Sequence, residues 1–266
     1  MANEEINQIE IRGVNKNFAI DKKSVDVLKD INLEFKRGEF VCIVGASGCG
    51  KSTLLRMLSG LEPVEQGEIV IGGEKVLAPS LKTGMVFQES RLFPWLSVEK
   101  NVEFGITRSK AKRSKPADKK KVVENLIQLV GLKGFEKAIP KQLSGGMQQR
   151  VSIARGLINN PEVLLLDEPF GALDAITKIN MQNEILRIWE SERKTMILVT
   201  HDIDEAVYLG DKVVVLSSRP GSVRKIINVD LPRERDRSSP EFAAVCSKIY
   251  KEFFKDAKIK EPEYYI

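Results

Sequence analysis

A glycine-rich segment at residues 45–52, Gly-Ala-Ser-Gly-Cys-Gly-Lys-Ser, carries the clearest chemical signal in the sequence. It fits the pattern of a phosphate-binding loop and lies between an apolar run, Phe40–Val44, and a helical pattern, Ser52–Leu58. Glycines let backbone N–H groups turn toward phosphate oxygens, Lys51 supplies a cation, and Ser52 supplies a hard oxygen ligand for Mg²⁺. The positive end of the following helix adds to the attraction. The alternative is an ordinary glycine-rich turn, and the flanking strand and helix argue against it.

Two adjacent carboxylates, Asp167 and Glu168, follow the apolar run Val163–Leu166. Because successive side chains of a strand point to opposite sides, the two acids can have different functions. Asp167 would hold Mg²⁺ directly or through water, and Glu168 would orient a water molecule as a general base. An acid pair alone is more typical of a solvated turn or a helix cap. The phosphate-binding loop in the same chain favours the catalytic interpretation.

A second glycine motif occupies Leu143–Arg150, Leu-Ser-Gly-Gly-Met-Gln-Gln-Arg, with Ser144 at the start of a predicted helix. A hydroxyl, exposed N–H groups and a helix N-terminus form an anion site. The chain would then have two γ-phosphate sites but one phosphate-binding loop. A head-to-tail homodimer resolves this, with each nucleotide between the loop of one copy and Ser144 of the other. The alternative for this segment is a simple helix cap.

The only histidine, His201, comes after the apolar run Met196–Val199. Carboxyl ends of strands line the ligand crevice of an open parallel sheet. A neutral imidazole at this place could hydrogen-bond both the γ-phosphate and the attacking water. The alternative is a purely structural histidine.

Short apolar runs that predict strands alternate with helical patterns along the chain. They occur at Ile9–Ile11, Phe40–Val44, Glu68–Ile71, Met85–Phe87, Val163–Leu166, Met196–Val199 and Lys212–Leu216. The later runs are apolar throughout, which is typical of a parallel sheet covered on both faces. Short polar turns separate the first runs, for example at Arg37-Gly38 and Gly72-Gly73. These turns predict a small antiparallel sheet at the start of the chain.

Two helices can be placed from their patterns. One follows Ser144, and the other follows Asp174 as a plausible N-cap. The apolar stripe of the second helix is predicted to be Ile176, Ile179, Ile185, Leu186 and Trp189. Helical patterning from about Val98 to Gln142 predicts an insertion between two strands of the sheet. The residues after Pro220 are interpreted as a short polar tail.

Composition excludes several classes of protein. The chain has 266 residues, of which 42% are hydrophobic and 30% charged, so a folded core is expected. An odd count of three cysteines suits a reducing compartment, no apolar run approaches a membrane span, and the N-terminus does not look like a signal peptide. The net charge of +5 is local, because eight of the 42 Lys and Arg residues and one acid lie in Arg108–Lys121. The rest of the chain is slightly acidic, so the positive net charge gives only weak support for nucleic-acid binding.

Together these segments resemble the nucleotide-binding subunits of ABC transporters, from about Ile9 to Gly221. The motifs that carry the resemblance are Walker A at Gly45–Ser52, the Q-loop glutamine Gln88, the signature motif at Leu143–Gln148, Walker B at Val163–Glu168, the D-loop at Gly171–Asp174 and the switch histidine His201. Phe18 is placed like the aromatic residue that stacks on adenine. The basic run is the departure from the family pattern, and it lies where such proteins vary.

The resemblance implies a single ABC ATPase domain over residues 1–266, of the α/β P-loop NTPase class. Its parts would be a RecA-like core, an N-terminal antiparallel β-subdomain, a helical subdomain inserted at about 90–160, and a short tail at 222–266. The implied catalytic residues are Glu168, His201 and Gln88, and the implied Mg²⁺ ligands are Ser52, Gln88 and Asp167. The implied ATP-binding residues are Phe18, Gly45, Ala46, Ser47, Gly48, Cys49, Gly50, Lys51, Ser52, Thr53, Ser144, Gly145, Gly146, Gln148 and Asp174.

A finer resemblance is to the ATPases of nitrate, taurine, alkanesulfonate and bicarbonate importers. It rests on Phe93–Leu96, Pro169–Ala175 and Ser217–Gly221. It implies an ATP-hydrolysing homodimer at the cytoplasmic face of the cell membrane, coupled to a permease and, indirectly, to a solute-binding protein. The segment from Gln88 to about Val102 would link the core to the helical insert. Exposed Phe93, Trp95 and Leu96 would receive a permease helix, and core packing is the alternative for Phe93 and Trp95.

Three rival functions are weaker. A DNA- or ribosome-acting ABC protein usually has two cassettes or long coiled-coil inserts, and neither fits this length; no nucleic acid is expected. A P-loop kinase has no use for Leu143–Gln148, and a non-catalytic module would have no need of both Glu168 and His201. Within the loop, Cys49 is expected to need no chemistry of its own, and its alkylation is expected to inhibit by bulk, with ATP protecting it.

Overall fold

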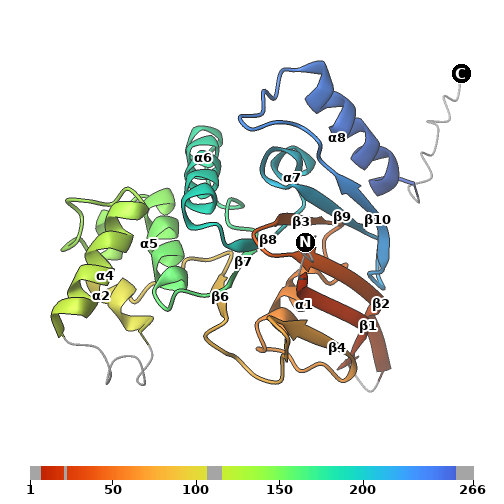
Figure 1. Cartoon of the computed structure of the whole chain (residues 1–266), viewed down its shortest axis with the longest axis horizontal. Coiled ribbons are helices and arrows are strands. Elements are labelled where there is room, and N and C mark those ends of the chain that lie inside the picture. Colours follow the sequence, from red (N-terminus) through yellow and green to blue (C-terminus); the bar gives the residue numbers. More distant parts are fainter. Residues whose placement is uncertain (1–6, 21–22, 107–115, 256–266) are drawn as a thin grey trace, which may run out of the picture.

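Two β-sheets share a core with helix α1 (Lys51–Leu58) in the computed structural model, which describes residues 7–20, 23–106 and 116–255 (Figure 1). Within these ranges the first sheet is antiparallel and has the order β2-β1-β4-β5. Its strands are β1 (Asn7–Ile20), β2 (Lys23–Lys36), β4 (Gln66–Ile71) and β5 (Glu74–Lys75). The prediction of an antiparallel sheet at the start of the chain is therefore confirmed, although one strand expected near it, Phe40–Val44, belongs to the second sheet.

The second sheet has the order β10-β9-β3-β8-β7-β6 in the described part of the chain. Its strands are β3 (Phe40–Val44), β6 (Thr83–Val86), β7 (Val163–Asp167), β8 (Thr195–Thr200), β9 (Lys212–Leu216) and β10 (Val223–Asn228). All neighbours pair in parallel except β10, which runs antiparallel to β9 at the edge. Because β3, β7 and β8 are parallel, the segments that follow them meet at one edge of the sheet. These segments contain the phosphate-binding loop, Glu168 and His201.

Both faces of the parallel strands are buried, as their continuous apolar runs predicted. Along β3, alternate residues belong to opposite cores: Cys42 packs with one and Ile43 with the other. One core contains the apolar residues of α1 and the antiparallel sheet. The other contains residues of helices α5 to α8 and of the helical insert. The sheet is thereby held rigidly between two layers, which fixes the strand ends that carry the site.

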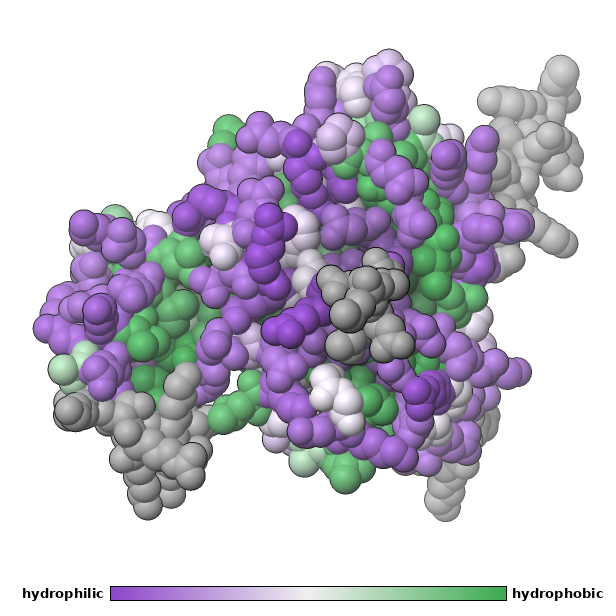
Figure 2. Space-filling model, in the orientation of Figure 1, coloured by the Kyte–Doolittle hydropathy of each residue, from purple (hydrophilic) through white to green (hydrophobic). Residues whose placement is uncertain are grey.

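The helices of the described ranges cover the second sheet and build the insert. They are α2 (Val98–Phe104), α4 (Pro116–Leu129), the short 3-10 helix η1 (Pro140–Gln142), α5 (Gly145–Leu157), α6 (Ala175–Glu192), α7 (Ile203–Leu209) and α8 (Pro240–Phe253). Helices α2, α4 and α5 stand together at the left of Figure 1, between β6 and β7 in sequence. On the face in Figure 2, apolar side chains gather over this helical part, whereas polar side chains cover most of the rest. The predicted limits of the insert, about 90–160, remain a prediction.

Three sequence-based expectations differ from the structure. The predicted stripe of α6 is wrong at Ile176 and Ile179, which are 74% and 45% exposed, because the buried face of this helix begins at Met181. The strand expected at Met85–Phe87 lies at Thr83–Val86. The polar tail contains β10 and the amphipathic helix α8, whose Phe242 joins the core.

Residues 108–115 of the basic run lie outside the described residues, and the remainder begins α4. Among the helices of the described ranges, none combines the length and apolar character that crossing a bilayer requires.

Candidate functional site

The loop between β3 and α1 has the conformation that its glycines allow. Gly48 and Gly50 have φ angles of +77° and +102°, in the left-handed region that favours glycine. At Gly50 a Cβ atom would also lie 2.6 Å from Leu28 Cδ2, so a larger residue would collide with the antiparallel sheet. The loop therefore turns sharply into α1, and the N-terminus of that helix faces the cavity described below.

Lys51 is held inside this loop. Its side chain is 5% exposed, and Nζ donates hydrogen bonds to the carbonyl oxygens of Gly45 at 2.8 Å and Ala46 at 3.2 Å. The closest carboxylate oxygen, Glu168 Oε1, is 3.9 Å from Nζ. The lysine charge is thus compensated mainly by carbonyl dipoles. A phosphate group in the cavity would give this ammonium group a fully charged partner at hydrogen-bonding distance.

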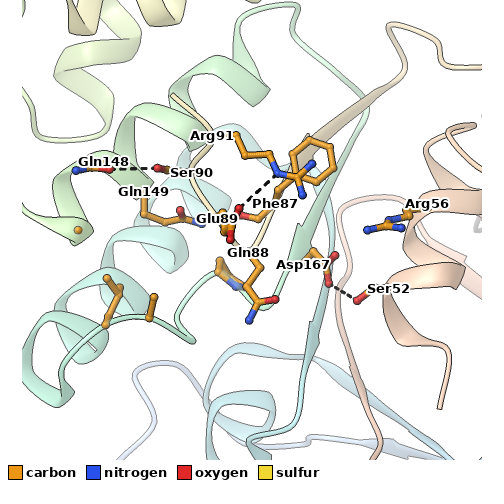
Figure 3. A pocket seen from close by; sticks show the side chains of 14 residues that line it. Ser52, Arg56, Phe87, Gln88, Glu89, Ser90, Arg91, Gln148, Gln149 and Asp167 are labelled. Atoms are coloured by element: carbon orange, nitrogen blue, oxygen red, sulfur yellow. Dashed lines mark hydrogen bonds and ion pairs between the residues drawn. The ribbon is translucent and has the colours of Figure 1, made fainter. Parts of the chain in front are cut away.

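Ser52 and Asp167 join α1 to the end of β7. Ser52 Oγ donates a hydrogen bond to Asp167 Oδ1 at 2.8 Å, as Figure 3 shows. Burial raises the pKa of the Asp167 carboxyl above its usual value, and the hydrogen bond from Ser52 acts in the opposite direction. A cation beside this carboxylate would therefore relieve an unfavourable buried charge.

The donor set here suits magnesium. In Figure 3, Gln88 and Asp167 reach into the cavity from the ends of the neighbouring strands β6 and β7. With Ser52 they offer hydroxyl, amide and carboxylate oxygens, which are hard ligands. Among the described residues, no group of three or more His, Cys, Asp or Glu could hold a metal ion. Mg²⁺ commonly takes only one or two carboxylates and completes its shell with phosphates and water, so these residues fit it.

Glu168 and His201 face each other across the ends of β7 and β8. Glu168 Oε2 lies 3.2 Å from His201 Nδ1, and the Glu168 N–H donates to the carbonyl oxygen of Val199 at 3.0 Å. Glu168 has a φ of +41°, which is unusual for a residue with a side chain. The two acids therefore serve different partners, as expected.

A cavity of about 520 Å³ collects seven of the fifteen predicted ATP-binding residues, together with Gln88 and Glu168. Its lining includes Phe18, Ser47, Gly48, Gly50, Lys51, Ser52, Thr53, Gln88 and Glu168. Phe18 is half-buried, and Lys16 Nζ lies 5.1 Å from its ring centroid. Arg219 also lines this cavity and was not assigned from the sequence, although it follows β9 at the same edge of the sheet.

A second cavity of about 580 Å³ adjoins the first through Ser52 and Gln88, which line both. Its wall includes Gly145 and Gln148 of α5. Ser90 Oγ donates to Gln148 Oε1 at 3.3 Å (Figure 3). The segment that follows Gln88 is therefore bonded directly to the helix that carries the second glycine motif.

Ser144, Gly146 and Asp174 do not line the Lys51 cavity. Ser144 is exposed, and its Oγ accepts a hydrogen bond from the Met147 N–H at 3.3 Å. Asp174 accepts one from the Thr177 N–H at 3.1 Å, and hydrogen bonding to the side chain and the N–H of Thr177 lowers the pKa of its carboxyl. Both residues are N-caps, which was the prediction for Asp174 and agrees with the predicted start of a helix at Ser144. One chain thus brings together only part of the predicted nucleotide site.

The comparisons with known proteins identify the family. The ABC transporter family matches residues 28–171. The chain belongs to the ABC transporter family. The aliphatic sulfonates import ATP-binding protein SsuB of Bacillus cereus (strain ATCC 10987 / NRS 248) is 47% identical over 245 residues, which cover 92% of this chain and 95% of that protein. The protein of the same name from Bacillus subtilis (strain 168) is 46% identical over 248 residues, 93% and 95% of the two chains.

Solved structures agree. The ATP-binding cassette MJ0796, in a dimeric post-hydrolysis state bound to ADP and Pi, has a TM-score of 0.72 and 32% identity, covering 84% of this chain and 100% of that one. The cbiO1 structure from Clostridium perfringens, part of the ABC transporter complex cbiONQ, has a TM-score of 0.75 and 26% identity, covering 95% and 96%. The predicted ABC ATPase fold, the nucleotide and the ATPase activity are confirmed, as is the resemblance to the importer subgroup.

The linker of this ABC ATPase, Gln88 to about Val102, is tied down by a residue that sequence reasoning missed. Asn101 is fully buried; its Nδ2 donates to the carbonyl oxygens of Phe93, Leu96 and Ser97, and its Oδ1 accepts from the Phe93 N–H. The signal in the sequence that could have identified this residue was an asparagine at a core position of a predicted helix. Trp95 is 73% exposed, as expected, whereas Phe93 is half-buried against Phe104 and Leu96 is half-buried too.

Cys49 does not behave as expected. It is 1% exposed, and burial raises the pKa of its thiol. The sulfur lies under the phosphate-binding loop, so close to Gly45 that a Cβ atom there would be 2.6 Å from it. A protonated, covered thiol reacts slowly. We therefore expect slow alkylation of the folded protein rather than the inhibition predicted from the sequence, whereas the expectation that Cys49 performs no chemistry is unchanged.

Proposed function

We propose that two copies of this ABC ATPase close head to tail around two ATP molecules. Lys51 and the rest of its loop would bind the phosphates from one copy, and Ser144 with Gly145 and Gly146 would bind the γ-phosphate from the other. The observation that carries this is the separation of the two groups: Ser144 is exposed, caps a helix and lines no part of the Lys51 cavity. The dimeric form of the related MJ0796 cassette supports it.

Each residue of the site has a role in this proposal. Glu168 orients and deprotonates the attacking water, and His201, bonded to Glu168, contacts the γ-phosphate and that water. Ser52, Gln88 and Asp167 hold Mg²⁺. When bound, the ion neutralises charge that develops on the phosphates. Phe18 stacks on the adenine at the far end of the cavity.

The permease would dock beside the linker. Trp95 and Phe104 are 73% and 62% exposed, and Phe93 lies 5.7 Å from the Trp95 ring and 4.3 Å from the Phe104 ring. Large apolar side chains gathered at one place are typical of a protein interface. We place the ATPase at the cytoplasmic face of the membrane, with a short permease helix on this aromatic group. The bonds from Ser90 to Gln148 and from Phe93 to Asn101 would carry the ATP-driven change to it.

The transported solute is proposed from the relatives alone. Two of the relatives, each 47% identical in sequence to this chain, are named as aliphatic sulfonates import ATP-binding proteins. We therefore propose uptake of a small anion of this kind, such as a sulfonate, taurine, nitrate or bicarbonate. A separate solute-binding protein and the permease would select it.

The proposed function is tested by purifying the ATPase from membranes with its partners. We expect one permease and one solute-binding protein to be encoded with it or to co-purify. Vesicles reconstituted with the ATPase facing the lumen should take up an alkanesulfonate only with ATP inside and the solute-binding protein outside. Replacing Trp95 by Ala should weaken the association with the permease without lowering the ATPase activity of the isolated subunit. Association with ribosomes or DNA, and no membrane partner, would contradict the proposal.

A further inference from the structure

Lys178 connects two helices behind the catalytic residues. It lies in the first turns of α6, four residues after the D-loop residue Asp174, and its N–H donates to the Asp174 carbonyl oxygen at 2.8 Å. Its Nζ lies 2.7 Å from Asp202 Oδ2 and 2.5 Å from Glu205 Oε1. Both acids belong to the start of α7. One ammonium group thus bridges the helix that follows the D-loop and the helix that follows His201.

The network continues into the backbone on both sides of His201. Thr200 Oγ1 donates to Glu205 Oε2 at 2.6 Å and accepts from the Asp202 N–H at 3.0 Å. Asp202 Oδ1 in turn accepts from the Glu205 N–H at 3.1 Å. The residues before and after the histidine are therefore fixed by the same two carboxylates that Lys178 holds.

The His201 side chain has little else to orient it. It is 60% exposed, and its hydrogen bond within the described residues is the one to Glu168 at 3.2 Å. A small cavity of about 100 Å³ lies beside it, lined by Glu168, Gly171, Lys178, Glu205 and others. The position of the imidazole thus depends on the backbone turn that the network holds.

We propose that Lys178 is a positioning residue that couples the D-loop, Gly171–Asp174, to the turn that carries His201. The inference rests on the proposed dimer. A Cβ atom on Gly145 would lie 3.7 Å from Leu173 Cδ2 of the D-loop, so a second copy that meets the Ser144 motif also comes close to the D-loop. Movement of the D-loop on closure is passed through α6 and Lys178 to Asp202 and Glu205, and brings His201 to the γ-phosphate. Hydrolysis is then favoured only when the second copy is in place.

Removing Lys178 alone would leave a buried acid without its cation. The Glu205 side chain is 6% exposed, and burial raises the pKa of its carboxyl while Lys178 and Thr200 act against that. A single variant could therefore lose activity by misfolding. Replacing Glu205 by Gln in the same chain removes the unpaired charge, and leaves the bridge between the helices broken.

The test compares Lys178→Met, Lys178→Met with Glu205→Gln, and Lys178→Arg. The matched control is Lys212→Met. Lys212 Nζ lies 2.8 Å from Glu39 Oε1 in an ion pair that is also largely buried, at the end of the parallel strands opposite the site. Steady-state ATPase kinetics and thermal melting are measured for all four. We expect the first two to lower kcat about ten- to a hundredfold with an unchanged KM for ATP, and the arginine variant to recover most of it. The control should keep kcat.

A second measurement separates this inference from the proposed function. ATP-induced dimerisation is followed in the same variants combined with Glu168→Gln. We expect dimerisation to persist without Lys178, because its role is in hydrolysis. A full kcat in the double variant would overturn the positioning role. A fall in kcat that follows the fall in melting temperature, and that is equally large in the Lys212→Met control, would overturn it too. Absence of a dimer even with Lys178 intact would instead overturn the proposed function.

Discussion

The two halves of the proposed nucleotide site differ in how completely one chain builds them. The Lys51 half lies where three parallel strands end, and its side chains are already bonded: Lys51 to the loop carbonyls, Ser52 to Asp167, and Glu168 to His201. The Ser144 half lies at the exposed start of α5, where the serine caps its helix and does not line the Lys51 cavity.

The difference indicates where rigidity and motion are needed. Phosphate groups and Mg²⁺ require a preorganised set of donors, and a sheet covered on both faces supplies it. The Ser144 half begins α5, which the sequence predicts to be part of the helical insert, and the segment from Gln88 to Asn101 is bonded to α5 through Ser90 and Gln148. A half-site on a separate part of the fold can approach or leave a nucleotide on another copy. Ligand binding to the closed arrangement then shifts the population toward it.

The largest effect is expected at Glu168. Glu168→Gln keeps the size of the side chain but cannot accept the proton of the attacking water, so kcat should fall about 10²- to 10⁴-fold with ATP still bound. Turnover and nucleotide affinity are measured together. Glu162→Gln, just before the other end of the same strand, is the control and should leave kcat unchanged. Wild-type turnover in Glu168→Gln would contradict the assignment.

Lys51→Ala should mainly weaken the binding of ATP by the Lys51 half of the site. The variant removes the cation closest to the phosphates, and loss of a charge-assisted bond predicts an ATP affinity lower by about ten- to a hundredfold. Nucleotide titration checks this, and a melting curve without ATP shows whether the loop still folds. Unchanged affinity in a folded variant would remove Lys51 from the phosphate site.

Ser144→Ala should affect the other half selectively. Loss of one hydrogen bond to a charged phosphate predicts a fall in kcat of about tenfold and weaker ATP-induced dimerisation, with ATP affinity of the single copy kept. The control is Ser239→Ala, which removes an equivalent N-cap hydrogen bond, from the Phe242 N–H, at the start of α8. Equal effects of both variants on kcat and on dimerisation would show that Ser144 acts only as a helix cap.

Asn101→Ala tests the connection between the halves. The variant leaves the Phe93 N–H and several carbonyl groups without their partner, so the free energy of unfolding should fall by about 1–3 kcal/mol. Denaturant unfolding measures this against Asn180→Ala, at an exposed position. Comparable stability of the two variants would show that the linker does not depend on Asn101.

The smallest effect is expected at Cys49. Because this thiol is buried and its pKa is raised, alkylating reagents at neutral pH should leave it unmodified and the ATPase active. Mass spectrometry of the modified residue checks this, with the denatured protein as the positive control. Rapid labelling of Cys49 in the folded chain would show that the loop opens without nucleotide.

The sequence predicted best what depends on continuous local patterns. The buried strands β3 and β9 were placed with their observed limits, because an unbroken apolar run has few alternatives in a parallel sheet. The helix starts at Ser144 and Asp174 were also predicted, since a capping side chain acts within one turn.

What the sequence did not predict depends on distant contacts. Ile176 and Ile179 fit a helical stripe, but only the packing of α6 shows that the core begins at Met181. The burial of Cys49, the entry of Arg219 into the nucleotide cavity and the bridge from Lys178 to α7 all join segments far apart in the chain. No local pattern determines such contacts.

A crystal structure of Glu168→Gln with ATP and Mg²⁺ tests the central claim most directly. We expect two copies related by a two-fold axis, with each γ-phosphate about 3 Å from Lys51 Nζ of one protomer and from the Ser144 hydroxyl of its mate. A nucleotide held by Lys51 while every Ser144 faces solvent, in any pairing of chains, would contradict the account.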